Sequence, residues 1–231
     1  MASKRFDAAE SKDDGNVHIL LAASGSVATI KLPLISKSLA NHANVSVRII
    51  LTDSAKNFLQ GQAEEQPSLE AMSKTDGVDG VYFDEDEWSK PWIRGDKILH
   101  IELRRWAHIM VIAPLSANTM AKMANGISDN LLTSVIRAWD TTGMIDMRKK
   151  HIMIAPAMNT AMWRHPITKK QLKIIDQDWT IDDESSVILL KPIEKELACG
   201  DTGDGAMMDW KQIVARVEEH LSLQKVEKSD T

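Results

Sequence analysis

The residues best suited to chemistry stand in short loops that follow apolar runs of the sequence. Residues 22–28 (AASGSVA) form a turn of small residues at the start of a helical pattern, where backbone N–H groups and serine hydroxyls can surround a phosphate. The turn lacks both the GxGxxG spacing of dinucleotide-binding folds and the GKS or GKT ending of a P-loop. Taken alone, it is explained equally well as a tight turn capped by serine.

Two further loops carry hydroxyl and amide groups at the same kind of junction. Residues 51–54 (LTDS) place Thr52 and Ser54 where they could reach the same phosphate, although an ordinary helix cap explains them better in isolation. Residues 114–119 (PLSANT) follow the apolar run 109–113. Their Ser, Asn and Thr side chains could bind ribityl oxygens or the polar edge of a flavin ring.

The segment 155–163 (APAMNTAMW) combines an amide with apolar side chains. Asn159 could anchor a carboxylate through its side-chain amide, while Met and Trp residues would form an apolar wall. By composition alone, Met158 and Met162 are better explained as core-filling residues.

His100 is the candidate base. It lies in residues 98–106 (ILHIELRRW), and its titration range suits proton transfer if it faces a cofactor. A lone histidine is nevertheless more often structural, and His108 and His165 compete with it for the role.

The only cysteine, Cys199, stands in the glycine-rich segment 197–207 (LACGDTGDGAM). Such a segment is typical of a loop that folds over a pocket. A lone thiol is by default buried and structural, whereas on a glycine-rich loop it is better placed to be exposed and functional.

Alternating apolar runs and helical patterns predict the elements that position these residues. Strands are expected at 17–23, 45–51, 109–113, 151–155 and 187–190, and helices at 26–41, 54–60, 118–125, 130–139, 166–176 and 209–223. Several runs are apolar at consecutive positions, as in strands covered on both faces. The order predicts a doubly wound, flavodoxin-like (Rossmann-like) α/β sandwich of three layers with a parallel sheet. Its ligands should bind beyond the carboxyl ends of the strands.

Length and composition fit one domain. The 231 residues are 43% hydrophobic, so we expect a single domain at 16–223, with disordered tails at 1–15 and 224–231. The acidic segment 61–80 is poor in large apolar residues and is expected to be a mobile insertion.

Charge and cysteine content narrow the partners. A formal charge of −5 without a basic stripe argues against nucleic acid. No apolar run approaches the roughly 20 residues that cross a bilayer, so we expect a cytoplasmic protein without membrane contact. One cysteine permits neither an intramolecular disulfide nor a multi-cysteine zinc site, and we expect no metal.

Together these segments resemble the homo-oligomeric flavin-containing cysteine decarboxylases, and within that family the phosphopantothenoylcysteine decarboxylases. The matching motifs are GSVA with Lys31 after it, LHIELRRWA, VIAPLSANT with GISDNLL, APAMNTAMW with HPIT, and LACGDTGDGAM. They run in the family's order from Val17 to about Met207. One departure is Glu196, where the family often has a basic residue.

The resemblance implies an FMN cofactor and assigns roles by position. FMN would be held by Gly25, Ser26, Val27, Thr52, Ser54, Ser116, Ala117, Asn118, Thr119 and Ala157. His100 matches the active-site histidine and Cys199 the cysteine of a flap. The substrate, phosphopantothenoylcysteine, would be bound by Asn159, Met162, Lys31, Ala198 and Met207.

The resemblance also implies an assembly and an alternative function. The family builds its sites at contacts between protomers of a homotrimer, with the histidine from one chain and the flap from another. Related proteins act as inhibitory subunits of a protein phosphatase, which is the competing interpretation and a conceivable second role. A flavodoxin-like electron carrier fits less well, because it would have no use for the His, Asn and Cys motifs.

Overall fold

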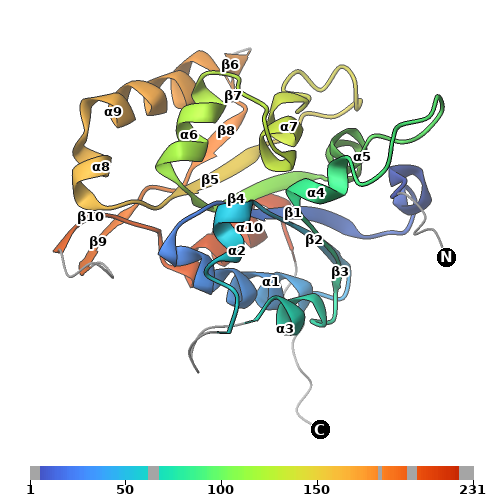
Figure 1. Cartoon of the computed structure of the whole chain (residues 1–231), viewed down its shortest axis with the longest axis horizontal. Helices are drawn as coiled ribbons and strands as arrows, with labels where there is room; N and C mark the ends of the chain where they lie inside the picture. Colours follow the sequence, from blue (N-terminus) through green and yellow to red (C-terminus); the bar gives the residue numbers. More distant parts are fainter. Residues whose placement is uncertain (1–5, 62–67, 182–183, 197–201, 224–231) are drawn as a thin grey trace, which may run out of the picture.

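The computed structural model describes residues 6–61, 68–181, 184–196 and 202–223, which form three layers (Figure 1). The middle layer is a sheet of β1 (Val17–Ala23), β2 (Val45–Leu51), β3 (Val78–Tyr82), β4 (Ile109–Leu115), β5 (Ile152–Pro156) and β8 (Val187–Leu189). Neighbouring strands are parallel and lie in the order β3-β2-β1-β4-β5-β8. The chain thus winds outward in both directions from β1 and β4, as in Rossmann-type sheets. The predicted doubly wound sandwich is confirmed.

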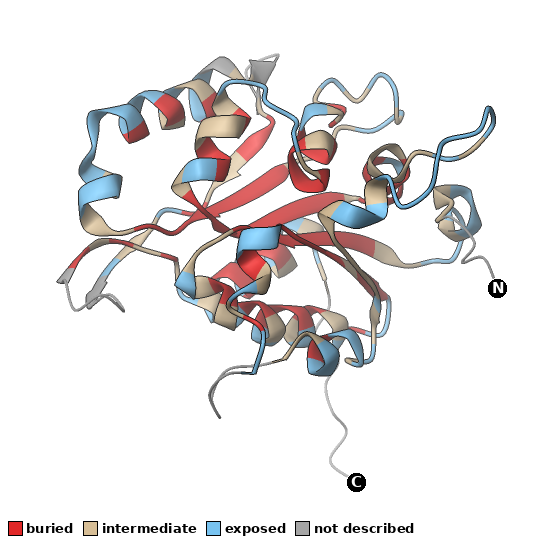
Figure 2. Ribbon diagram, in the orientation of Figure 1, coloured by how far each residue is buried: buried red, intermediate tan, exposed pale blue. Residues whose placement is uncertain are grey.

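Helices cover both faces of the sheet because alternate side chains of a strand point to opposite sides. Ile19 and Leu21 of β1 share a core with α1 (Leu32–Ala40), α2 (Asp53–Lys56), α3 (Leu69–Ser73) and α10 (Trp210–Leu221). Leu20 and Ala22 share the other core with α5 (Leu99–Trp106), α6 (Ala117–Ala124) and α7 (Leu131–Arg137). Figure 2 shows buried residues concentrated in the sheet and on the helix faces turned toward it.

Shorter elements join these layers. They are η1 (Ala8–Ser11), η2 (Val27–Lys31), α4 (Asp84–Glu87), α8 (Thr160–Arg164), α9 (Pro166–Lys173), η3 (Ile174–Asp178), the hairpin of β6 (Thr180–Ile181) and β7 (Glu184–Ser185), and the hairpin of β9 (Ile193–Glu196) and β10 (Thr202–Ala206). Within the ranges that the structure describes, no helix is both long and apolar enough to pass through a membrane.

The acidic segment 61–80 contributes regular structure that the sequence analysis did not predict. Helix α3 begins at the Ser68 cap, whose hydroxyl accepts the Ala71 N–H at 3.2 Å, and it buries Met72 in the core. Strand β3 then pairs with β2 and forms an edge of the sheet. Asp79 and Gly80 interrupt the apolar pattern of this half-buried strand, which is why its sequence does not stand out.

Residues 6–11 also differ from the expected disordered tail. The Phe6 ring centroid lies 4.0 Å from the guanidinium carbon of Arg48, and the Ala8 N–H donates to Glu102 Oε2 at 2.9 Å. The prediction of a tail over 1–15 is wrong for these residues, because an aromatic contact and a buried carboxylate hold them against α5 and β2.

A stack of rings joins β1 to the segment before β4. The His18 ring lies between Trp106 and His108, at centroid distances of 4.5 and 4.9 Å. Nδ1 of His108 accepts the His18 N–H at 2.9 Å, so this nitrogen must be unprotonated. Burial, with the nearby charge of Arg148, lowers the pKa of His108 to about 4 from its ordinary 6.5.

We expect His108 to make the folded state sensitive to acid. A folded-state pKa below the unfolded value means that its contribution to stability is complete above pH 6.5 and is lost as the pH falls toward about 4. In His108→Asn, the amide oxygen can replace Nδ1 as acceptor but does not titrate. Urea unfolding at about pH 7 and about pH 5 should therefore show a smaller difference in this variant than in the wild type.

The matched control is His165→Asn, at an exposed histidine that caps α9. Its pH dependence should follow that of the wild type. An unchanged pH dependence in His108→Asn would contradict the assignment.

Candidate cofactor site

A cavity of about 590 Å³ opens at the carboxyl ends of β1, β2, β4 and β5. Its walls include residues 25–27, 52–54, 116–119 and 157–159, each of which follows one of these strands. The strand order reverses between β1 and β4, and this reversal opens a crevice where ligands of doubly wound proteins bind. The cavity is of the size that small-molecule and cofactor sites have.

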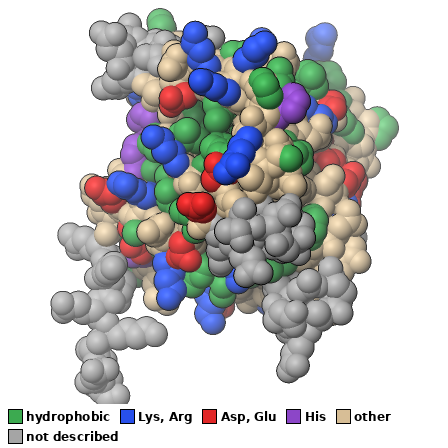
Figure 3. Space-filling view, turned by 90° about the vertical axis from the view of Figure 1, so that its left-hand side faces the viewer, with side chains coloured by type: hydrophobic (Ala, Val, Ile, Leu, Met, Phe, Trp, Pro, Cys, Tyr) green, Lys and Arg blue, Asp and Glu red, His purple; other side chains and the backbone are tan. Residues whose placement is uncertain are grey.

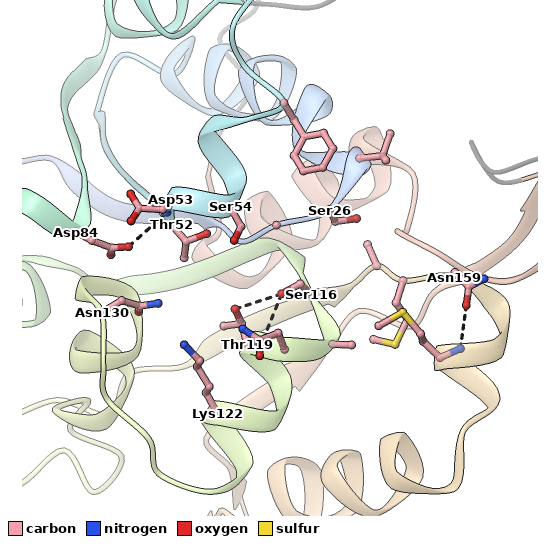
Figure 4. Close-up of a pocket in the computed structure, with 18 of the residues that line it drawn as sticks. Ser26, Thr52, Asp53, Ser54, Asp84, Ser116, Thr119, Lys122, Asn130 and Asn159 are labelled. Carbon is pink, nitrogen blue, oxygen red and sulfur yellow. Dashed lines mark hydrogen bonds between the residues drawn. The ribbon is translucent and has the colours of Figure 1, made fainter.

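The residues that cap five helix N-termini line this cavity (Figure 4). Their side-chain oxygens accept backbone N–H groups as follows: Ser26 from Ala28 at 3.4 Å, Thr52 from Ala55 at 3.3 Å, Ser116 from Thr119 at 3.3 Å, Asn130 from Thr133 at 2.9 Å, and Asn159 from Met162 at 3.0 Å. Helix N-termini carry partial positive charge and spare N–H donors. The cavity is therefore built to receive an anionic ligand rich in hydrogen-bond acceptors.

Ser24 and Gly25 join the loops at the centre of the site. The fully buried Ser24 hydroxyl donates to the Pro114 carbonyl at 3.1 Å and accepts the Ser116 N–H at 2.8 Å, which fixes the end of β1 to the end of β4. A Cβ on Gly25 would lie 2.5 Å from the Cβ of Ser54. Only glycine therefore lets the first loop approach α2 this closely.

Charged side chains gather at one end of the cavity. Asp84 accepts the Leu131 N–H at 3.1 Å and the Asp53 N–H at 3.4 Å, and burial raises the pKa of Asp84 above its ordinary value. Lys122 pairs with Asp129 at 2.7 Å. In Figure 4 the labelled Asp53 and Asp84 lie away from Ser26 and Asn159, so an anionic group of a ligand has its best position near Ser26.

The structure brings together all the residues predicted to hold the cofactor. The cavity is lined by Gly25, Ser26, Val27, Thr52, Ser54, Ser116, Ala117, Asn118, Thr119 and Ala157, together with the predicted substrate residues Asn159 and Met162. It is also lined by residues that the sequence analysis did not select, which are Asp53, Phe58, Asp84, Lys122, Asp129, Asn130 and Met158. Of these, Asp129 and Asn130 belong to the GISDNLL motif, which could have identified them.

Other predicted residues lie elsewhere. His100 is on α5 and is not among the described residues that line this cavity. Lys31 is exposed at the end of η2, and Met207 is 8% exposed and packs in the core beside α10. Ala198 and Cys199 lie outside the described residues.

The described part of the glycine-rich segment, from residue 202 onward, contains strand β10, which packs against the cavity wall. The Met158 N–H donates to the Gly205 carbonyl at 3.0 Å. A Cβ on Gly205 would lie 2.2 Å from the Met158 carbonyl oxygen, and one on Gly203 would lie 1.8 Å from Oγ1 of Thr160. The glycines of β10 thus serve close packing against residues 158–160.

A polar cavity at the switch point of a doubly wound sheet is the architecture of mononucleotide- and flavin-binding proteins. A family model described as Flavoprotein matches residues 7–222. The chain therefore belongs to the flavoprotein family, and the family resemblance inferred from its motifs is confirmed.

Similar proteins include phosphopantothenoylcysteine decarboxylases and, in one case, a probable thymidylate synthase. A probable phosphopantothenoylcysteine decarboxylase of Arabidopsis thaliana is 46% identical over 200 residues, which cover 86% of this chain and 86% of the relative. A phosphopantothenoylcysteine decarboxylase of Mus musculus is 39% identical, with 93% of this chain and 92% of the relative covered. A probable thymidylate synthase of Schizosaccharomyces pombe is 51% identical over 92% of this chain, but the chain spans only 30% of that relative's length.

Two solved structures share the fold. A cysteine-to-serine mutant of PPC decarboxylase, complexed with pantothenoylaminoethenethiol, has a TM-score of 0.73 and 42% identity over 90% of this chain and 99% of that chain. The FMN binding protein AtHal3 has a TM-score of 0.70 and 43% identity over 91% of this chain and 100% of that chain.

Gly25→Ala should weaken flavin binding. The added methyl would meet Ser54 at 2.5 Å and push the first loop away from α2. We expect the affinity for added FMN, measured by fluorescence titration, to fall at least about tenfold, which corresponds to about 1.4 kcal/mol. The control is Gly80→Ala, whose Cβ would have its three nearest contacts with the Tyr82 side chain, the closest at 3.1 Å from the hydroxyl oxygen. Equal affinity in both variants would show that the close approach at Gly25 does not shape the site.

Proposed function

We propose that this chain is an FMN-dependent phosphopantothenoylcysteine decarboxylase, which converts 4'-phosphopantothenoylcysteine to 4'-phosphopantetheine and CO2 on the route to coenzyme A. The observation that carries the proposal is a cavity in which Asn159 and Met162 stand beside the polar loops of a flavoprotein. Two relatives and one similar structure that carry the name of this enzyme match this chain over most of their length.

The cavity fits FMN. The FMN phosphate would lie at residues 25–27 and Ser54, where N–H groups and hydroxyls gather away from Asp53 and Asp84. Residues 116–119 supply hydroxyl and amide groups for the ribityl chain and the polar edge of the ring. When bound, FMN supplies a reversible two-electron acceptor that the side chains lack.

The chemistry explains why an electron acceptor is needed. Loss of CO2 from an unmodified cysteine carboxylate would leave a carbanion without an electron sink. Oxidation of the thiol-bearing carbon to a thioaldehyde places a C=S group β to the carboxylate. The electrons of the breaking C–C bond then move to sulfur and give an ene-thiolate.

Asn159, His100 and Cys199 would then bind the substrate and transfer protons. The Asn159 amide orients the substrate carboxylate, since its Oδ1 caps α8 and its Nδ2 hydrogens are not needed for that cap. His100 transfers a proton near the thiol during oxidation. Cys199 protonates the ene-thiolate at the carbon that lost CO2. With FMN bound, the two electrons taken from the substrate would be available to return to it, so that the net reaction would be a decarboxylation.

The position of His100 supports a site shared between protomers of a homotrimer. The cavity of the same chain does not include His100 among its described lining residues, and the His100 side chain, paired with Glu87 of α4, is 21% exposed. The loop before α5 exposes Trp88, Trp92 and Ile93, which are 65%, 49% and 70% exposed. Large apolar side chains held near a catalytic histidine suit a contact with a second copy of the chain.

The surroundings of Asn159 favour an anionic substrate. Figure 3 shows Lys and Arg side chains, with Asp and Glu side chains among them, on the face of the molecule that includes α8 and α9. Lys169, Lys170 and Lys173 are exposed there. The positive charges of these three lysines would attract a substrate that carries both a phosphate and a carboxylate.

The alternative is an inhibitory subunit of a protein phosphatase built on the same scaffold. That role needs no carboxamide in the cavity, whereas Asn159 and Met162 both line it. Turnover of phosphopantothenoylcysteine by the purified chain separates the two functions, because a purely regulatory protein would leave the substrate unchanged.

The experiment that tests the function follows both products. Purified protein with FMN should release CO2 from phosphopantothenoylcysteine and form phosphopantetheine, identified by mass spectrometry. In Cys199→Ser we expect CO2 release to continue and the oxidised ene-thiol to accumulate, because the final proton donor is missing. Full conversion to phosphopantetheine by this variant would remove Cys199 from the mechanism.

A mixing experiment tests the shared site. His100→Asn and Asn159→Asp should each be inactive, and the aspartate can still cap α8. If His100 and Asn159 of one site come from different chains, co-expression of the two variants in equal amounts should restore about one quarter of wild-type activity. Each site then has a chance of about one half of receiving an intact His100 and an independent chance of about one half of receiving an intact Asn159. Sites built within one chain would give no restoration, and this outcome would rule out sharing.

A further inference from the structure

Helix α4 carries four consecutive carboxylates, and each has a different partner. Asp84 binds backbone N–H groups at the cavity, Glu85 pairs with Lys56 at 3.1 Å, and Asp86 accepts the Phe83 N–H at 2.8 Å. Glu87 points to α5 and binds His100. One short helix therefore connects the wall of the cavity to the candidate base.

Both carboxylate oxygens of Glu87 form hydrogen bonds with His100. Its Oε1 lies 2.8 Å from Nδ1 of His100, and its Oε2 accepts the backbone N–H of His100 at 3.1 Å. The Glu87 side chain is only 4% exposed, so water does not compete for it. An ionised carboxylate only accepts hydrogen bonds, and Nδ1 must therefore carry the ring proton. The nitrogen left for proton transfer is Nε2.

The helix that carries His100 is held at its other end as well. The fully buried Lys150 donates to the Arg104 carbonyl at 2.6 Å, and Asp146 pairs with Lys150 at 2.6 Å and with Arg104 at 3.1 Å. Because α5 is fixed at this end, the contact with Glu87 decides the tautomer and the ring orientation of His100 rather than the position of the helix.

We propose that Glu87 is a positioning residue, which holds His100 as the Nδ1-protonated tautomer and presents Nε2 to the substrate thiol. The inference rests on the proposed function for the identity of the substrate. The contact between Glu87 and His100 itself does not depend on it. The arrangement follows the general logic by which a buried carboxylate orients a catalytic imidazole.

The test is Glu87→Gln, which keeps the side-chain size. In the wild type each His100 donor meets its own Glu87 oxygen, whereas the amide offers an oxygen to one of the two and an NH2 group, which only donates, to the other. We expect kcat to fall about 10- to 100-fold with KM changed less than about twofold, and bound FMN to be retained. In ¹⁵N spectra of histidine-labelled protein, the His100 signal, assigned with His100→Asn, should lose its protonated Nδ1 form.

The matched control is Glu85→Gln, on the same helix, where the carboxylate is 61% exposed and pairs with a lysine. Its kcat and its His100 spectrum should equal those of the wild type. The inference is overturned if Glu87→Gln keeps the wild-type tautomer, keeps the wild-type kcat, loses FMN, or matches the control.

These outcomes also separate the inference from the proposed function. If the wild type does not decarboxylate but Glu87→Gln changes the tautomer, the proposed function fails and the positioning contact stands. If the wild type is active and the tautomer does not respond, the positioning inference alone fails.

Discussion

The site depends on one constraint, which is that parallel strands all end at the same edge of the sheet. Strands β1, β2, β4 and β5 are each followed by a turn into a helix, so the residues that cap those helices come together without being adjacent in sequence. Ser26, Thr52, Ser116, Asn130 and Asn159 stabilise their own helices and also line the cavity. The interactions that stabilise the fold thus make the same edge electrostatically suited to an anionic cofactor.

Close approach of backbone segments gives that edge its shape. Ser24 joins β1 to β4 through two hydrogen bonds, and Gly25 lets the first loop reach α2. On the other side, Gly203 and Gly205 seat β10 on residues 158–160. Strand β10 is therefore anchored to the loop that carries Asn159. Under the proposed function, the parts of the cavity that bind substrate and cofactor would share this wall.

The sequence predicted what depends on local pattern. The run 19–23 is apolar at consecutive positions because β1 is buried on both faces, and the residues predicted to hold the cofactor follow such runs directly. Strand β3 was missed because an edge strand needs no continuous apolar pattern. Asp84 and Glu87 were missed for a different reason. Their partners, Leu131 and His100, lie 47 and 13 residues away, and only the fold brings them into contact.

Under the proposed function, the distance of His100 from the cavity of its own chain would give an assembly of several copies a direct role in catalysis. The loop from Trp88 to Ile98 is held in shape by its own hydrogen bonds. The Asp96 side chain accepts the Ile93 N–H at 3.0 Å, and the Asp96 backbone carbonyl accepts the Nε1–H of Trp92 at 3.1 Å. A loop that is held in shape while it exposes apolar side chains loses little conformational entropy when a partner covers it. Under the proposed function, Glu87 orients the imidazole before assembly, and the contact between copies then brings it to the substrate. Flavin binding would be a property of one chain, whereas turnover would be a property of the assembled protein.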